Sequence, residues 1–162
     1  DRPEYMFGSN WKFSWKGFAL NLNWIAATNV NKMLEVEYRI PFTNSGNRGL
    51  LDYFYRDCWT TENPNGTLPR AAEKSESWNS APSTLWLRDA SYIRLKSAQF
   101  GYTFGRNKFF DRIGINSLNV SFTGYNLLTF TGLTFQDPET VSNNDGVYPL
   151  VKTYNLSLNI NF

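Results

Sequence analysis

The sequence predicts an all-β fold, a segment of an antiparallel transmembrane β-barrel with long extracellular loops, and three observations support this. Apolar and polar residues alternate with a period of two in five separate segments, as in strands with one apolar and one polar face. The polar faces carry mainly Asn, Ser, Thr and Gln, and aromatic residues make up 17% of the chain although the mean hydropathy is -0.45. The connections between the segments alternate in length, as they do in outer-membrane barrels.

The five alternating segments lie at about 5–15, 17–27, 92–104, 117–128 and 150–162. In the third of them, Ile93 and Leu95 have the opposite parity to Ala98 and the apolar residues that follow it. Either a β-bulge near Ser97 brings the two halves into line, or the upstream half lies above the membrane. We favour the second interpretation.

The connections between these segments differ in length. Lys16-Gly17 is a tight turn, the stretch at about 28–91 is long, 105–116 is of medium length, and about 129–149 is long again. Such an alternation places the long connections outside the cell and Phe162 on the periplasmic side. Within the first long loop, helical spacing of apolar residues over 50–58 predicts a short helix, 38–42 extends the preceding strand, and 108–113 favours a helical turn.

Composition excludes several classes of function. The 162 residues include no His and one Cys, which excludes His-dependent catalysis, His-zinc sites and an internal disulfide. The net charge of +2, without basic runs, gives no electrostatic reason to expect nucleic acid as a partner. No two carboxylates have a defined catalytic separation, and we therefore expect no enzyme.

Five antiparallel strands do not form a complete membrane barrel. Hydrocarbon offers no hydrogen-bond partners, so every strand edge within it must be paired, and closure begins at about eight strands. We therefore expect further strands before Asp1. A soluble carbohydrate-binding β-sandwich is the weaker alternative. The solvent-facing side of such a sheet normally carries Lys and Glu, whereas the polar faces here carry mainly Asn, Ser, Thr and Gln.

Four patches of the chain carry a family resemblance. They are 56–64 with the following Pro69-Arg70, 89–96 continuing to 100–102, 124–130 followed by 137–139, and Tyr148-Pro149 with 155–162. In order and spacing these patches resemble the C-terminal end of SusC/RagA-type TonB-dependent outer-membrane transporters. Gly105 and Ser157 depart from the family pattern without disturbing the alternation.

This resemblance implies a barrel of about 22 strands filled by an N-terminal plug, in the bacterial outer membrane. Such proteins import oligosaccharides or peptides with a SusD-like lipoprotein, powered by an inner-membrane TonB complex that acts through the plug. The plug is absent from this chain, which would supply the last five strands and two outer loops. Its other partners would be the rest of its own barrel, the lipid bilayer and the outer-membrane insertion machinery. An alternative is a fragment observed as a substrate of that machinery.

Candidate ligand-binding residues lie in the first long loop. Aromatic faces stack on sugar rings, and charged groups bind hydroxyls. The platforms are Tyr53, Trp59, Trp78 and Trp86, and the polar groups are Arg70, Arg88 and Asp89. For Trp59 and Trp86 we favour the alternative that they pack the loop onto the rim of the barrel.

Two further groups of residues are candidates for other roles. Asp137, Glu139 and Asp145 offer oxygen ligands for calcium, but their spacing fits no defined loop and we favour a solvated turn without a cofactor. The final segment resembles the signal by which the insertion machinery captures the last strand of a barrel, by strand addition at an open edge. The residues that carry this signal are Asn155, Ser157, Leu158, Ile160 and Phe162.

Overall fold

The computed structural model describes residues 2–42, 49–72, 77–134, 137–139 and 150–162. The chain divides into two compact units. The first comprises 1–31, 89–139 and 148–162, and the second comprises 32–88 and 140–147.

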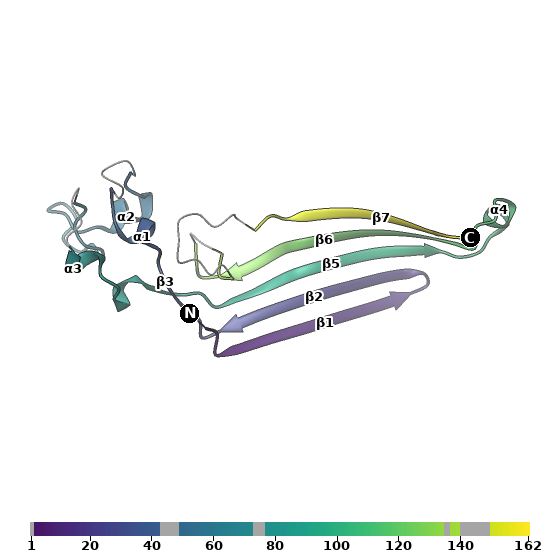
Figure 1. Ribbon diagram of the computed structural model, residues 1–162, viewed down its shortest axis with the longest axis horizontal. Helices are drawn as coiled ribbons and strands as arrows, with labels where there is room; N and C mark the ends of the chain where they lie inside the picture. Colours follow the sequence, from purple (N-terminus) through teal and green to yellow (C-terminus); the bar gives the residue numbers. More distant parts are fainter. Residues whose placement is uncertain (1, 43–48, 73–76, 135–136, 140–149) are drawn as a thin grey trace. The chain divides into compact units, whose positions relative to one another are not determined.

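The first unit is a five-stranded antiparallel sheet in the order β1-β2-β5-β6-β7 (Figure 1). The strands are β1 (Tyr5–Trp15), β2 (Phe18–Thr28), β5 (Tyr92–Phe104), β6 (Ser117–Thr131) and β7 (Thr153–Asn161). The antiparallel all-β architecture predicted from the alternation is therefore confirmed. β6 continues to Thr131, past the end indicated near residue 128, and β7 begins at Thr153 rather than near residue 150.

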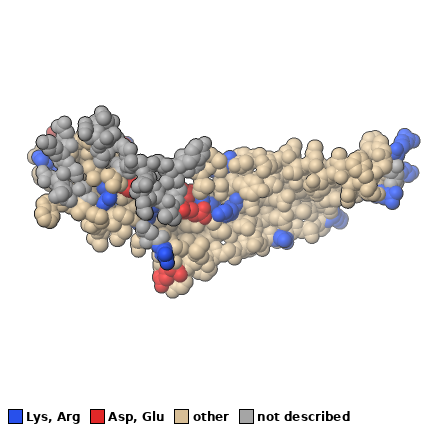
Figure 2. Space-filling model, in the orientation of Figure 1, with Lys and Arg blue, Asp and Glu red and all other residues tan. Residues whose placement is uncertain are grey.

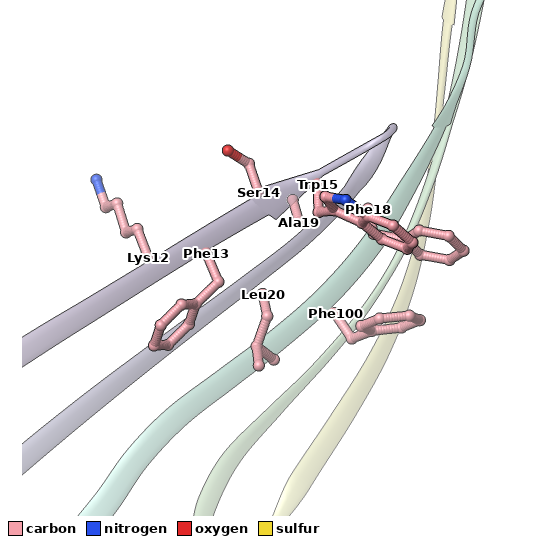
Figure 3. Close-up of a pocket in the computed structure, with 8 residues that line it drawn as sticks. All are labelled: Lys12, Phe13, Ser14, Trp15, Phe18, Ala19, Leu20 and Phe100. Atoms are coloured by element: carbon pink, nitrogen blue, oxygen red, sulfur yellow. The ribbon is translucent and has the colours of Figure 1, made fainter.

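Cross-strand register places the apolar side chains of neighbouring strands side by side. Leu20 pairs with Phe13 on β1 and with Phe100 on β5, and these side chains line a shallow hollow of about 520 Å³ (Figure 3). Lys12 and Ser14 point to the other side of the strand, because successive side chains of a strand alternate between the two faces. The sheet therefore has one apolar face and one polar face.

Large side chains on the apolar face of β1 and β7 are exposed. Trp15 is 68% exposed, Leu156 70% and Leu158 62%. A soluble sandwich would cover this face with a second sheet, and the described residues of this unit form one layer only. Most of the visible surface along the strands is uncharged (Figure 2).

A β-bulge interrupts the pairing near the middle of the sheet. Trp24 pairs with Leu95 whereas Asn23 pairs with Ser97, so Lys96 is the extra residue on β5. The bulge restores the parity, because it brings Leu95 onto the same face as the apolar residues beyond Ser97. The bulge interpretation is thus confirmed, and the favoured interpretation is not needed to explain the change in parity. The upstream half stays paired in the sheet as far as Tyr92.

The short connections meet at one end of the sheet. Lys16 and Gly17 form the β1–β2 turn with positive φ values of 45° and 90°, and the amide of Thr103 donates to the Gly17 carbonyl at 2.8 Å. At the same end, the connection from β5 to β6 contains α4 (Lys108–Arg112) (Figure 1). The amide of Asn116 donates to the carbonyl of Asn161 at 2.7 Å, which ties this connection to the end of β7.

The second unit folds around a small core of its own, formed by Leu34, Phe54, Cys58, Leu68 and Trp86. Its elements, with the short strand pair β3–β4 that leads in and out of it, are β3 (Asn31–Met33), α1 (Val36–Arg39), α2 (Asp52–Asp57), α3 (Ser77–Ser80), a 3-10 turn (Thr84–Trp86) and β4 (Leu87–Asp89).

The two local predictions for this unit had different outcomes. The helix predicted over 50–58 is confirmed as α2. The predicted strand extension at 38–42 is wrong, because the amides of Tyr38 and Arg39 both donate to the carbonyl of Glu35 and so close a helical turn. Among the described helices, none has both the length and the apolar character needed to cross a bilayer.

Candidate functional site

The loop that follows α2 is held by hydrogen bonds to Asp57. The Asp57 carboxylate accepts hydrogen bonds from the backbone amide and the hydroxyl of Thr67. The backbone carbonyl of Asp57 accepts a hydrogen bond from the amide of Leu68 at 3.0 Å. The amide of Trp59 donates in turn to the carbonyl of Leu68 at 2.9 Å. The two ends of the loop are therefore clamped together, and Trp59, which is 43% exposed, is held at its surface.

Two more residues of this loop have structural roles. The side-chain amide of Asn63 donates to the carbonyl of Cys58 at 3.3 Å. A Cβ atom on Gly66 would lie 2.6 Å from the same carbonyl oxygen, closer than any side chain tolerates. The patch at 56–64 that carries part of the family resemblance thus specifies the shape of this loop.

Arg88 lies close to two titratable groups of the second unit. Hydrogen bonds from Thr67 lower the pKa of Asp57, and the positive charge of Arg88 lowers it further. Burial raises the pKa of Tyr53, and Arg88 opposes that rise. The Tyr53 hydroxyl donates to the carbonyl of Tyr38, and the Arg88 guanidinium donates to the carbonyls of Leu85 and Leu87 at 2.7 and 3.0 Å. Tyr53 and Arg88, both predicted as ligand-binding groups, therefore already form hydrogen bonds to backbone carbonyls within the second unit.

Trp86 does not offer a free ring to a ligand. It is 1% exposed, its ring stacks near Phe54 with 6.2 Å between centroids, and its indole nitrogen donates to the carbonyl of Asn79 at 3.0 Å. Its faces are covered by the core of the second unit, which agrees with the packing role that we favoured for Trp86 over the role of a ligand platform. Trp78, at 88% exposure, is the most open of the predicted platforms.

Tyr55, which is 70% exposed on α2, was predicted as part of the helix and was not counted among the ligand platforms. Its position four residues after the exposed Leu51 is the signal that indicates a shared helix side. The other two predicted polar groups, Arg70 and Asp89, are both exposed. Asp89 belongs to the first unit, where hydrogen bonds from the hydroxyl and amide of Ser91 lower its pKa.

A second cluster lies on the polar face of the sheet and is centred on Arg94. This side chain is 1% exposed. Its guanidinium donates to Glu139 at 2.6 Å, to Asp137, and through Nε to the hydroxyl of Thr129 at 2.9 Å. The hydroxyl of Tyr92 donates to the second oxygen of Glu139 at 2.8 Å. Arg94 therefore fastens the segment 137–139 to the sheet.

This cluster changes the interpretation of the acidic residues. Asp137 and Glu139 are only 20% and 23% exposed and both bind Arg94, so they do not form a solvated turn. Asp145 lies outside the described residues, and within the described ranges no three His, Cys, Asp or Glu side chains gather as a metal site would require. Sequence reasoning missed Arg94. The available signal was a charge on a strand face that is otherwise mostly uncharged.

The final strand has one free edge among the described residues, because β7 pairs with β6 alone. Leu158 and Ile160 are 62% and 50% exposed, and Phe162 is 79% exposed. Asn155 and Ser157 lie on the opposite, polar face, paired with Thr123 and Ser121. Backbone groups along the outer edge of β7 are thus available to a further strand.

The whole chain is similar in sequence to two TonB-dependent receptors. No family model matches it. It is 30% identical over 174 residues to TonB-dependent receptor P26 of Formosa agariphila, covering 99% of this chain and 17% of that protein. It is 28% identical over 173 residues to TonB-dependent receptor P3 of the same organism, covering 99% of this chain and 16% of that protein.

Solved structures with the same fold include the RagAB peptide importer in its closed-closed state. The TM-score is 0.76 at 25% identity, over 98% of this chain and 17% of that one. A structure of the RagAB peptide transporter gives a TM-score of 0.74 at 24% identity, and the match covers 94% of this chain and 17% of that one. The chain thus spans 16–17% of the length of the relatives it matches. As one segment of such a protein, it belongs to the SusC/RagA-type TonB-dependent transporters.

Proposed function

We propose that this chain forms part of the barrel wall of an outer-membrane importer that takes up peptides or oligosaccharides with a SusD-like lipoprotein partner and TonB-derived energy. The observation that carries the proposal is a sheet with one exposed apolar face and one polar face, in a chain similar to TonB-dependent receptors. Lipid would cover the apolar face and the aqueous interior of the barrel would contact the polar face.

The dimensions of the sheet support a membrane position. Its strands contain 9 to 15 residues, and a tilted strand crosses a bilayer with about 9–11. The two outer strands, β1 and β7, each have one neighbour in the described sheet, and hydrocarbon does not tolerate unpaired strand edges. Further strands of the same barrel would therefore pair with them.

Peptides are the first substrate class to test, because the matched solved structures are described as a peptide transporter and importer. Oligosaccharides are the second, because exposed aromatic side chains such as Trp59 and Trp78 provide stacking surfaces. The RagAB structures also motivate the lipoprotein partner. The proposed role is transport, with no catalytic step.

An uptake assay on the full-length protein tests this function. Cells that express the transporter are supplied with labelled peptide and oligosaccharide mixtures, with and without dissipation of the proton gradient. We expect energy-dependent accumulation of one class, abolished by deletion of the gene. Accumulation that is unaffected by the deletion for both classes would contradict the proposal.

We also propose that β7 serves as the assembly signal of the barrel, through Asn155, Ser157, Leu158, Ile160 and Phe162. The open edge of β7 supports capture by strand addition. Deletion of Phe162 is expected to reduce folded protein in the outer membrane several-fold, measured by heat-dependent gel mobility, whereas Tyr55→Ser on α2, where the side chain is 70% exposed, should not. Equal folded amounts for both variants would overturn this role.

A further inference from the structure

We propose that the connection between β5 and β6 is an anchor for an anionic lipid surface. Phe109 and Ile113 would enter the interfacial layer of the bilayer, and Arg106, Lys108 and Arg112 would bind lipid phosphate groups. This anchor rests on the proposed function, because it requires the sheet to span a membrane.

The first step is the position of α4 relative to an aromatic girdle. On the apolar face at this end of the sheet, the ring of Tyr102 lies 4.5 Å from that of Phe18 and 4.6 Å from that of Phe104, between centroids. Phe18 also stacks near Phe100 at 5.8 Å. Aromatic girdles of this kind lie at the interface between hydrocarbon and water. Since β5 ends at Phe104 and α4 begins at Lys108, α4 lies at the level of the lipid headgroups.

The second step is the exposure of two apolar side chains on this short helix. Phe109 is 67% exposed and Ile113 is 51% exposed. They are four residues apart, a spacing that places them on the same side of a helical turn. Phe110, between them in sequence, is partly buried. The helix therefore directs one pair of apolar groups outward.

The local structure fixes this arrangement. The side-chain oxygen of Asn107 accepts hydrogen bonds from the amides of Phe109 and Phe110, each at 3.0 Å. At the other end, the amides of Ile113 and Ile115 both donate to the carbonyl of Phe110, at 3.1 and 3.0 Å. Gly114 follows with a φ of +73°. This left-handed conformation favours glycine and commonly ends a helix. The two apolar side chains are thus held outward by a capped turn.

The third step is charge. The connection carries three basic residues, Arg106, Lys108 and Arg112, and one acidic residue, Asp111. Figure 2 shows Lys and Arg atoms, in blue, at the end of the sheet where α4 lies. In the neighbouring β1–β2 turn, Lys16 contributes another cation, with its ammonium group 5.0 Å from the centre of the Trp15 ring.

Exposed aromatic and aliphatic groups beside Lys and Arg form the composition of segments that lie in the membrane interface. Basic groups within a Debye length of an anionic leaflet are attracted to it. A lipid surface fits this combination better than a protein partner, because the apolar groups are few and continue the aromatic girdle of the strands. The occupant is therefore an anionic phospholipid surface.

Spin-label accessibility in lipid nanodiscs tests this inference on the full-length protein. A nitroxide is placed at Ile113→Cys, with other accessible cysteines replaced, in discs of phosphatidylcholine with or without phosphatidylglycerol. In discs with phosphatidylglycerol we expect collisions with oxygen to dominate over collisions with a water-soluble nickel complex. The triple change R106Q/K108Q/R112Q should lower the oxygen-to-nickel ratio several-fold. A matched control, K12Q/R56Q/K152Q, removes the same number of charges elsewhere and should leave the ratio unchanged.

The outcomes separate this inference from the proposed function. A second label at Leu158→Cys reports whether the apolar face meets lipid, and its exposure to water would overturn the barrel itself. If the Leu158 label lies in lipid while the Ile113 label stays in water with phosphatidylglycerol present, the lipid anchor alone is wrong. Shielding of the Ile113 label from both reagents in native membranes would show a protein partner instead and also overturn the anchor.

Discussion

Replacement of Arg94 by Ala should release the segment 137–139 from the polar face of the sheet. In the structure, this buried guanidinium binds two carboxylates and the hydroxyl of Thr129. Hydrogen bonds to charged groups contribute about 1.5–3 kcal/mol each. Breaking a buried ion pair costs about 3–5 kcal/mol when the remaining charge stays buried.

The expected magnitude lies at the lower end of that range. Asp137 and Glu139 remain about one fifth exposed (20% and 23%), so water recovers part of the lost interaction once Arg94 is gone. We therefore expect the free energy of local opening to fall by about 3 kcal/mol, which corresponds to roughly a hundredfold faster amide exchange, at about 1.4 kcal/mol per factor of ten.

Hydrogen–deuterium exchange of the full-length protein in detergent measures this effect. Peptides ending at Glu139 should exchange faster in Arg94→Ala, whereas peptides from the centre of β2 should not change. Arg94→Lys should give an intermediate rate, because a lysine retains the charge but cannot bind both carboxylates in the same fork geometry. Exchange near Glu139 at the wild-type rate in Arg94→Ala would refute the role of this cluster.

Three further predictions concern the second unit. Gly66→Ala should destabilise the loop after α2 by about 1–3 kcal/mol, because its new methyl group would lie 2.6 Å from a backbone carbonyl; proteolytic cleavage of that loop measures the loss. Gly105→Ala is the control, because its new methyl group would have no neighbouring atom within 4 Å. Equal cleavage of the two variants would contradict the clash at Gly66. Trp86→Ala should lower the stability of the second unit by about 3–5 kcal/mol, whereas Trp78→Ala should leave it almost unchanged. Exchange protection of the amides of α2 measures both effects, and equal losses would show that burial does not distinguish the two rings. Because hydrogen bonds hold the pKa of Asp57 below its usual value, its contribution is present above the unfolded-state pKa of about 3.9 and is lost as the pH falls through the lower folded-state pKa. Asp57→Asn should remove this pH step from the exchange profile of the loop, and persistence of the step would assign it to another group.

The strands were predictable because their signal is local. Alternation over 154–162 follows from one chain segment placed between two different environments, and the structure has β7 there. The bulge was predictable only as one of two alternatives, because it is defined by pairing. Lys96 is the extra residue through what lies opposite it on β2, which one strand's pattern does not specify.

The site was less predictable because its determinants are distant in sequence. Trp78 and Trp86 are both aromatic residues in a polar loop, and only packing against Phe54 distinguishes the buried one from the exposed one. Arg94 binds carboxylates 43 and 45 residues away, and no spacing rule relates them. The loop after α2 was recognisable by its motif, but its shape depends on the clamp between Asp57 and Thr67.

Accessibility scanning of β7 in the full-length protein, embedded in native membranes, tests the central claim most directly. Single cysteines from residue 154 to 160 are spin-labelled in turn, and collision rates with oxygen and with a water-soluble nickel complex are measured. We predict that labels at Leu156, Leu158 and Ile160 meet oxygen in lipid and that labels at Asn155 and Ser157 meet nickel in water, with a period of two. Uniform accessibility along the strand, or shielding of the apolar positions from both reagents, would contradict a lipid-facing sheet.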